Sequence, residues 1–250
     1  MENITSRRNP VCVHVKKLGT SAAYRAEHKQ FVCDGMKMLE EAVKSGAGII
    51  TVITASSLPF SLPPETEIYH AAQEMLDYLS PLKSARDILF ICKIPEAETC
   101  DISDGIHILL DNIQDPGNTG TIIRSASGFG MDSVILAGLC CDPYNPKTIR
   151  ATAGAIFRQR IIKISIPELE VLKNKGVSFT GTGLSGSGSP VTEELPENTV
   201  IAIGNEGTGL SDEILALCSR TVEIPMEQGC ESLNAAVAAS IIMWEYKRKG

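Results

Sequence analysis

Long apolar runs are the first feature that this chain of 250 residues lacks. No run reaches the roughly 18 residues that a membrane-spanning helix needs. The polar segment 1–10, which contains Arg7 and Arg8, also lacks the apolar stretch of a secretory signal. The sequence therefore predicts a cytoplasmic protein that makes no contact with a membrane.

Metal-binding and disulfide patterns are also missing. The eight cysteines include the neighbours Cys140 and Cys141 but form no C-x-x-C pair, and the four histidines are scattered. A zinc site needs clustered cysteine and histidine ligands, so we expect no metal cofactor. Without an export signal, reduced thiols are expected rather than a disulfide framework.

An excess of positive charge is missing as well, because the net charge is −7. This balance argues mildly against nonspecific binding to nucleic acid. Two acidic residues of the first thirty, Glu2 and Glu27, are outnumbered by basic ones. The basic residues of this segment are Arg7, Arg8, Lys16, Lys17, Arg25 and Lys29. On charge alone, such a segment is either an RNA-facing patch or an ordinary solvated surface.

Hydrophobic residues make up 43% of the chain, enough for a real core, and the length allows one large domain or two small ones. Residues 1–95 alternate between helical and strand-like patterns. We expect a helix over 28–44, a strand over 49–54, a helix over 71–79 and a strand over 88–94. The acidic segment 95–105 has no regular apolar pattern and is interpreted as a linker.

A second αβ series follows the linker. Strands are expected at 106–110, 133–136, 177–180, 200–203 and 221–224, and helices at 121–130, 167–175, 211–218 and 232–247. Alternating strands and helices over such a length predict a mostly parallel sheet covered on both faces. The predicted organisation is a domain at 1–98 and a second domain at 105–250.

One glycine-rich motif suggests a function that its context contradicts. The run from Gly181 to Gly186 matches the G-x-G-x-x-G dinucleotide-binding pattern and follows a strand. That reading needs a helix directly afterwards, whereas Pro190 and Pro196 follow here. A dehydrogenase is therefore disfavoured, and the glycines more simply let a loop pass close to a ligand.

Three polar loops follow strands of the second domain. The first contains Asn118, which is expected to cap a helix, and Arg124 nearly two turns further on. The second, 204–211, places Glu206 among glycines. The third, 224–234, places Ser232 and Asn234 at the start of the last helix, where such residues often only cap. Because the carboxyl ends of parallel strands share one edge of a sheet, we expect the loops to converge on a ligand.

These three loops resemble the three motifs of the SpoU (TrmH-like) RNA ribose 2′-O-methyltransferases, which belong to the SPOUT class. The runs that carry the resemblance are Asn-x-Gly-x-x-x-Arg, Gly-Asn-Glu-Gly-x-Gly-Leu and Ile-Pro-Met followed by Ser-Leu-Asn-Ala-Ala. The resemblance implies an α/β fold with a mostly parallel sheet and a C-terminal trefoil knot. Residues 4–95 resemble, more loosely, the L30e-like α/β domain that binds RNA substrates in this family, although Asp34 stands where relatives commonly carry Glu.

The resemblance also implies a cofactor and the residues that hold it. S-adenosylmethionine is the expected methyl donor, bound by the knot loops. By motif, the cofactor-binding residues are Gly183, Gly204, Ile224, Met226, Ser232 and Leu233. The Gly181–Gly188 run then becomes one wall of the pocket.

Catalytic roles follow from the same resemblance. A ribose hydroxyl is a poor nucleophile and needs a group that accepts its proton or stabilises the alkoxide. Arg124 corresponds to the family's essential arginine. Asn118 is expected to position Arg124 or the ribose, and Glu206, Ser232 and Asn234 to hold the RNA and the loops.

The implied partners are RNA, bound through the basic N-terminal domain, and a second copy of the chain. We expect the small residues of the last helix (Ala235, Ala236, Ala238, Ala239 and Ser240) to face that second copy, with packing inside one chain as the alternative. Ribosomal RNA is the expected substrate. Transfer RNA, a resistance methyltransferase that targets one ribosomal adenosine, and a non-catalytic RNA-binding protein on the same scaffold remain as alternatives.

Overall fold

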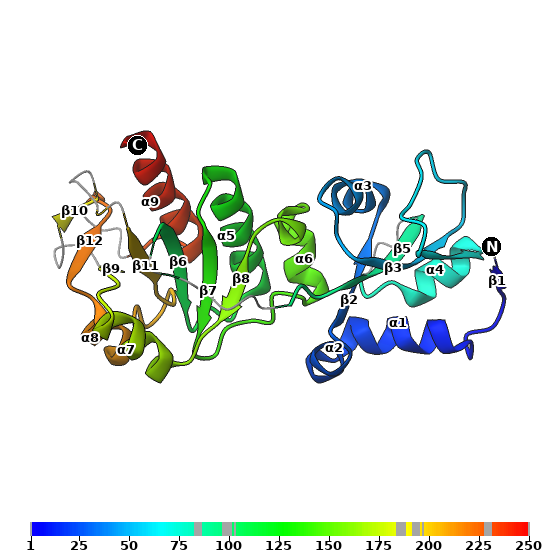
Figure 1. The fold of residues 1–250 in the computed structure, drawn as a ribbon, viewed down its shortest axis with the longest axis horizontal. Helices are drawn as coiled ribbons and strands as arrows, with labels where there is room; N and C mark the ends of the chain where they lie inside the picture. The colour runs from blue at the N-terminus through cyan, green and yellow to red at the C-terminus, as the bar shows by residue number, and fades with distance from the viewer. Residues whose placement is uncertain are drawn as a thin grey trace. The chain divides into compact units, whose positions relative to one another are not determined.

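The computed structural model describes residues 2–82, 87–96, 102, 104–183, 189–191, 196, 198–227 and 232–249. It consists of two compact units (Figure 1). Unit 1 comprises Met1–Glu96 and Tyr144–Arg158, and unit 2 comprises Ala97–Pro143 and Gln159–Gly250. The chain therefore passes from one unit to the other three times.

Unit 1 is built on a sheet with the order β1-β4-β3-β5-β2. Its strands are β1 (Glu2–Ile4), β2 (Gln30–Asp34), β3 (Ile49–Thr54), β4 (Glu67–Ala71) and β5 (Ile88–Lys93). Its helices are α1 (Pro10–Thr20), α2 (Ala22–His28), α3 (Met36–Lys44), α4 (Gln73–Leu79) and α6 (Pro146–Thr152). Buried side chains of α1 and α4 form a core with alternate residues of the strands, such as Val32, Ile53 and Leu89.

The predicted helix over 28–44 is wrong in its first half. Residues Gln30–Asp34 form β2, and the helix begins only at Met36. Gly35 lies between them at φ +95°, a conformation that separates strand from helix and that side-chain-bearing residues rarely adopt. The apolar residues Phe31 and Val32 fitted a helical spacing by chance, because a short apolar run suits either structure.

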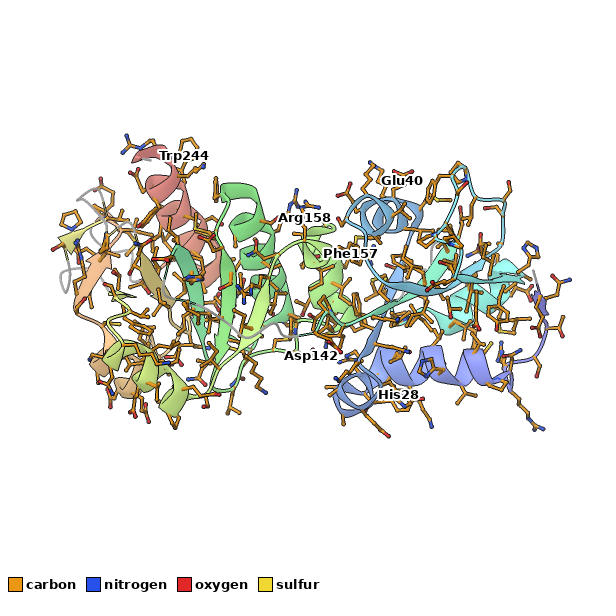
Figure 2. The ribbon with its side chains drawn as sticks, viewed as in Figure 1. His28, Glu40, Asp142, Phe157, Arg158 and Trp244 are labelled. Carbon is orange, nitrogen blue, oxygen red and sulfur yellow. The ribbon has the colours of Figure 1, made fainter. Side chains whose placement is uncertain are left out.

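A segment from the second half of the chain completes unit 1. Residues 144–158 contain α6 and a short 3₁₀ helix, η1 (Ala155–Phe157). The ring of Phe157 lies 6.2 Å from that of Phe31 and 6.3 Å from that of Phe90, and Tyr144 lies 4.9 Å from Phe31. Arg158, labelled beside Phe157 in Figure 2, forms a 2.9 Å ion pair with Glu41 of α3. No pattern in the sequence indicated this excursion.

Unit 2 contains a parallel sheet with the order β10-β12-β9-β11-β6-β7-β8. Its strands are β6 (Ile106–Asp111), β7 (Ser133–Ala137), β8 (Ile161–Lys163), β9 (Phe179–Thr182), β10 (Ser189–Pro190), β11 (Thr199–Ile203) and β12 (Arg220–Glu223). Its helices are α5 (Pro116–Phe129), α7 (Ile166–Asn174), α8 (Asp212–Leu217) and α9 (Ala235–Lys249). The prediction of an α/β fold with a mostly parallel sheet is confirmed.

The two faces of this sheet are covered by different helices. Helices α7 and α8 pack on the face that carries Leu109, Ile135 and Val200, while α5 and α9 lie side by side on the other (Figure 1). The Oγ atoms of Ser125 and Ser240 join α5 to α9 at 2.8 Å. After β6 the chain turns towards β7, and after β11 it turns the opposite way towards β12. The direction thus reverses between β6 and β11, the point at which open α/β sheets bind ligands.

The start of α5 differs from the prediction. The helix begins at Pro116 and is capped by Asp115, whose side chain accepts a hydrogen bond from the backbone N–H of Asn118 at 2.8 Å. Asn118 is therefore not the cap but a residue of the first turn. Asp before Pro is itself a typical helix start, because proline needs no hydrogen-bond partner at the first helical position. The side chain of Asn118 is left to make other contacts.

Candidate active site

Side chains from all three loops meet at the C-terminal edge of the unit 2 sheet. The Nδ2 atom of Asn118 donates to Oε1 of Glu206 at 2.5 Å. The Nδ2 atom of Asn234 donates both to Oε1 of Glu206, at 2.7 Å, and to Oδ1 of Asn118, at 2.9 Å. The three residues are 88 and 28 positions apart along the chain. The predicted convergence of the loops is thus visible as one hydrogen-bonded triangle.

The triangle also fixes the start of α9. Asn234 Oδ1 accepts the backbone N–H groups of Ala236 and Val237 at 3.0 and 3.3 Å, and Glu206 Oε1 accepts that of Ala235 at 3.1 Å. Free N–H groups of a first helical turn favour a negative charge. Glu206 therefore serves the helix and the triangle at once. The capping role considered for Asn234 is confirmed, together with contacts that capping alone does not require.

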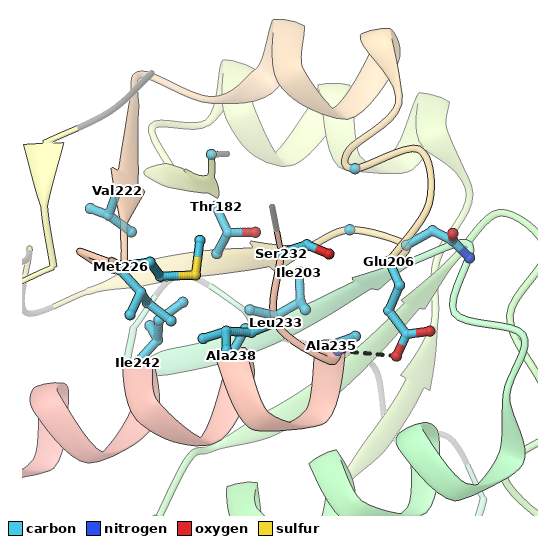
Figure 3. Close-up of a pocket in the computed structure, with 15 residues that line it drawn as sticks. Thr182, Ile203, Glu206, Val222, Met226, Ser232, Leu233, Ala235, Ala238 and Ile242 are labelled. Carbon is cyan, nitrogen blue, oxygen red and sulfur yellow. Dashed lines mark hydrogen bonds between the residues drawn. The ribbon is translucent and has the colours of Figure 1, made fainter. Parts of the chain in front are cut away.

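A pocket lies beside the triangle (Figure 3). Its lining includes all six residues expected to bind a cofactor: Gly183, Gly204, Ile224, Met226, Ser232 and Leu233. Figure 3 shows Glu206 at one end, bonded to Ala235, and Met226 with Ile242 at the other. The lining is thus largely apolar with a carboxylate at one end. Of the wall expected from the Gly181–Gly188 run, residues 184–188 lie outside the described part of the chain.

Gly204 allows the second loop to close. A Cβ atom there would lie 2.3 Å from the backbone C of Gly209 and 2.4 Å from the N of Leu210. The loop folds back at this point, because Asn205 and Gly209 exchange backbone hydrogen bonds at 3.0 and 2.8 Å. No side chain fits between these two strands of the loop, so the pocket wall requires glycine.

Comparison with known proteins identifies the family. Residues 105–244 match the family model described as the SpoU rRNA Methylase family. The chain belongs to this family. The resemblance drawn from the three motifs is confirmed.

Relatives of this SpoU-family chain extend over its whole length. It is 31% identical to the Bacillus subtilis 23S rRNA (guanosine(2553)-2′-O)-methyltransferase RlmP over 99% of this chain and 100% of that protein. It is 29% identical to the 23S rRNA (uridine(2479)-2′-O)-methyltransferase of Streptomyces viridochromogenes, over 90% and 85%.

Solved structures show the same fold. A putative RNA methyltransferase of the TrmH family from Porphyromonas gingivalis superposes with a TM-score of 0.89 at 25% identity, over 99% of this chain and 100% of that one. The SpoU methyltransferase AviRb from S. viridochromogenes, in complex with the cofactor AdoMet, gives a TM-score of 0.84 at 27% identity, over 97% and 98%.

Arg124 stands apart from the triangle and the pocket. It lies on the exposed side of α5, with Thr121 and Gly128, and does not line the pocket. The buried side of α5 carries Ile122, Ile123 and Ala126. The structure of one chain therefore assembles Asn118, Glu206, Ser232 and Asn234 but does not bring Arg124 to them.

The small residues of α9 do not form a free surface. Ala235, Ala236 and Ala239 are at most 4% exposed within the single chain, so they cannot face a second copy. For these three residues the alternative of packing inside one chain is correct, because small residues permit close packing of α9 within the chain; Ala238 and Ser240 are partly exposed. The exposed side of α9 instead carries Val237 and Trp244, the latter labelled in Figure 2.

A buried carboxylate that the sequence analysis did not single out supports the site. Asp111 is 1% exposed, and its Oδ2 accepts the N–H of Ser211 at 2.6 Å while its Oδ1 accepts from Asn112 Nδ2 at 2.8 Å. Asn205 Nδ2 in turn donates to the carbonyl of Asn112 at 3.2 Å. These contacts join the end of β6 to the second loop. The sequence could have indicated this role, because Asp111 stands at the end of a predicted strand, where ligand-site residues are expected.

The thiols near the site are held in their neutral form. Burial raises the pKa of Cys218 to about 11 and also raises that of Cys140. Because the thiolate is the nucleophilic form of cysteine, neither residue is a reactive nucleophile near neutral pH.

Proposed function

We propose that this protein transfers a methyl group to a ribose 2′-hydroxyl of RNA, with S-adenosylmethionine as the donor. The observation that carries the proposal is the triangle of Asn118, Glu206 and Asn234, which joins three family motifs beside one pocket. The chain is thus an RNA (ribose-2′-O)-methyltransferase of the SpoU family. Ribosomal RNA is the proposed substrate, since both curated relatives are named for methylation of 23S rRNA.

The chemical character of the pocket lining suits the cofactor. Apolar side chains of Ile203, Leu233 and Ile242 offer a surface for the adenine ring and the thioether arm, and backbone at Gly183 and Gly204 can approach closely. Glu206 places a carboxylate on the wall, which favours a cationic ligand. When bound, S-adenosylmethionine supplies an electrophilic methyl group on a sulfonium.

The remaining catalytic work belongs to the side chains of this protein. Arg124 is proposed to orient the ribose and phosphate and to stabilise or accept the charge that develops at the 2′-oxygen. A guanidinium normally stays protonated, so orientation is its first role. Asn118 and Asn234 hold Glu206 in place through hydrogen bonds. The triangle and Ser232 are proposed to keep the three loops correctly positioned around the substrate.

We propose further that the enzyme is a homodimer in which Arg124 acts at the pocket of the partner subunit. Arg124 is exposed on α5 and lies outside its own pocket. The adjoining exposed side of α9 presents Val237, 48% exposed, and Trp244, 52% exposed. A Cβ atom on the exposed Gly128 would meet nothing within 4 Å in its own chain. A glycine inside a helix lowers its stability by about 1 kcal/mol relative to alanine. Close approach of a second chain at Gly128 would explain why a glycine stands there.

Mixing two inactive variants tests both proposals. In one variant, Arg124→Ala removes the guanidinium, and in the other, Ala238→Trp fills the pocket. Each homodimer should lose methyl transfer to ribosomal RNA, measured with isotope-labelled S-adenosylmethionine. Co-expressed mixed dimers should regain activity, because an intact pocket then meets an intact Arg124 from the partner. If Arg124 acted within its own chain, mixed dimers would stay inactive.

The alternative of a non-catalytic RNA-binding protein predicts a different outcome for the unmodified chain. A catalyst should both melt at a higher temperature with S-adenosylmethionine and transfer its methyl group. A protein that keeps only the scaffold would bind RNA without transferring methyl groups from the cofactor. A transfer-RNA substrate would be recognised by methylation of that RNA in place of ribosomal RNA.

Three further features belong to the proposal. Unit 1 is proposed to be an L30e-like RNA-binding domain. The domain boundaries 1–98 and 105–250 stay a prediction, and the compact units differ from them because Tyr144–Arg158 belongs to unit 1. A C-terminal trefoil knot is proposed for unit 2, which is supported by the insertion of β11 between β6 and β9 and the return of α9 onto α5. A cytoplasmic location stays a prediction; among the described residues no helix is long and apolar enough to cross a membrane.

One member of the basic segment has a structural role instead. Arg25 is only 3% exposed, and its Nη1 donates to the carbonyl of Leu18 at 2.6 Å. It joins α2 to α1 and is removed from the set proposed to face RNA. The exposed cations that remain near α1 include Arg7, Arg8 and Lys17.

A further inference from the structure

Two cations share one aromatic ring in unit 1. The Cζ atom of Arg7 lies 4.3 Å from the ring centroid of Tyr78, and Nζ of Lys16 lies 4.9 Å from it. Lys16 Nζ also donates to the carbonyl of Tyr78 at 2.9 Å. Arg7 is exposed, and no carboxylate among the described residues forms an ion pair with it. Its guanidinium is thus held in place by stacking while its N–H groups remain available for an anion.

A groove adjoins this cluster. Its polar lining is Asn3, Thr5, Arg7, His70 and Glu74, and its apolar lining is Ile4, Ala71, Ala72 and Met75. Asn3 and His70 are register partners of the parallel strands β1 and β4, so their side chains lie on the same face of the sheet. The face opposite is the core, where Ile4 and Ala71 are buried. The groove therefore combines a fixed cation with several hydrogen-bonding groups.

We infer that this cluster and groove bind one nucleotide of single-stranded RNA, an inference that rests on the proposed function and adds a second RNA contact outside the catalytic pocket. The phosphate binds at Arg7 and Lys16, whose N–H groups match it in charge. The base enters the groove, where it stacks on the Arg7 plane and bonds to Asn3, Thr5 and His70. Glu74 supports this orientation, because a carboxylate repels a phosphate and accepts hydrogen bonds from an amino group.

Glu74 also predicts which bases bind best. Adenine and cytosine carry an exocyclic amino group that donates to a carboxylate, whereas uracil has a carbonyl at the corresponding position. Oligoadenylate and oligocytidylate should therefore bind more tightly than oligouridylate. Glu74→Gln should reduce this difference, since the amide can both donate and accept.

The test uses the full chain, because residues 144–158 are part of unit 1 and removal of unit 2 would remove them. Binding of labelled oligoribonucleotides of about 12 nucleotides is measured by fluorescence anisotropy at several salt concentrations. Arg7→Ala should weaken binding about tenfold and lower the salt slope by about 1, because one phosphate contact is lost. Arg7→Lys should restore the salt slope but not the affinity, because the planar stack is absent.

Lys37→Ala is the matched control. Lys37 is an exposed cation of α3 in the same unit and does not line the groove. Its replacement removes the same charge and should change affinity far less. Equal losses for Arg7→Ala and Lys37→Ala would overturn the inference, as would binding that ignores base identity and Glu74→Gln.

Failure of this inference can be told apart from failure of the proposed function. If only the groove assignment is wrong, Arg7→Ala will retain the binding of RNA and methyl transfer. If the proposed function is wrong, the unmodified chain will show neither a melting shift with S-adenosylmethionine nor methyl transfer. Where Arg7→Ala weakens oligonucleotide binding, methyl transfer should show a raised KM for RNA with a nearly unchanged kcat.

Discussion

The two edges of the unit 2 sheet carry polar clusters of opposite character. At the C-terminal edge, the triangle of Asn118, Glu206 and Asn234 is hydrogen-bonded and yet open, since Glu206 and Asn234 are exposed. At the N-terminal edge, His107 is 1% exposed and shares hydrogen bonds with Ser133 Oγ at 2.8 Å and the Asp104 carbonyl at 3.0 Å. The side chains of both clusters have hydrogen-bond partners, but only the cluster at the C-terminal edge lies where a ligand can reach it.

This contrast separates activity from stability. Side chains ordered at an exposed edge gain little free energy from burial, so their arrangement serves binding. Side chains buried at the opposite edge have no access to a ligand, so their hydrogen bonds serve the fold. Substitutions at the C-terminal edge should therefore reduce activity with a small change in stability, and substitutions at the N-terminal edge should do the reverse.

The largest expected effect is at Glu206. Glu206→Ala removes the acceptor shared by Asn118, Asn234 and the first N–H of α9, so the second loop (204–211) should be displaced. Methyl transfer should then fall by about 100-fold or more. The free energy of unfolding should fall by only about 1 kcal/mol, as for loss of an exposed helix cap. Activity assays and urea unfolding of the same preparation check both. A large loss of stability with proportionate loss of activity would contradict the functional role.

Gly204→Ala should abolish the cofactor-induced melting shift. The new Cβ would lie within 2.5 Å of three backbone atoms of the fold-back at Gly209 and Leu210, so the loop must open. Gly207→Ala in the same loop is the control, because its Cβ would come no closer than 3.5 Å to the Asn205 side chain. Thermal melting with and without S-adenosylmethionine compares them. Equal shifts in the two variants would show that the close approach is not required.

His107→Leu should destabilise the protein without affecting the pocket. It leaves the buried hydroxyl of Ser133 without its partner, at a cost of about 1–3 kcal/mol. Trp244 is the single tryptophan and lies in unit 2, so its fluorescence in urea reports this unit. Adding Ser133→Ala should cost little more, because both members of the pair are then gone. Additive losses would indicate that the two side chains act independently.

The smallest effect is a dependence of stability on pH. Burial lowers the pKa of His107 below its usual 6.5, so the folded protein keeps the ring neutral where the unfolded chain already binds a proton. The stability that His107 contributes is therefore complete above the unfolded pKa and declines as the pH falls through 6.5 towards the folded value. Unfolding free energies measured between about pH 5 and 8 should show this decline. His107→Leu should flatten it.

Much of this arrangement follows from short runs of sequence. Strands such as 49–54 and 200–203 were predicted almost to the residue, because buried β-branched runs bounded by turns have few alternatives. The six pocket residues were placed by motif, and all six line the pocket. Their roles towards cofactor and RNA stay predictions. Motif residues can be recognised from the sequence because contact with a ligand demands particular residue types at particular spacings.

Features that depend on contacts with residues elsewhere in the chain could not be predicted from the sequence. Arg25 is a cation in a basic segment, as expected of a residue that binds RNA. Only its hydrogen bond to the carbonyl of Leu18 shows that its role is structural. The helix at 10–20 and the short helix at 22–28 were not assigned, since their apolar faces are short. The exposed position of Arg124 depends on which side of α5 meets the sheet. In each case, the deciding contact lies in another part of the chain.

Residues 144–158 make the two units poor candidates for modular exchange. A chimera that joined a different N-terminal unit to residues 105–250 would carry Tyr144 and Phe157 without the rings of Phe31 and Phe90 that pack against them. A successful graft would have to bring a receiving surface for these two rings and a carboxylate for Arg158. Changes in unit 1 of this protein are therefore tied to changes in a segment that lies between two parts of unit 2 along the chain.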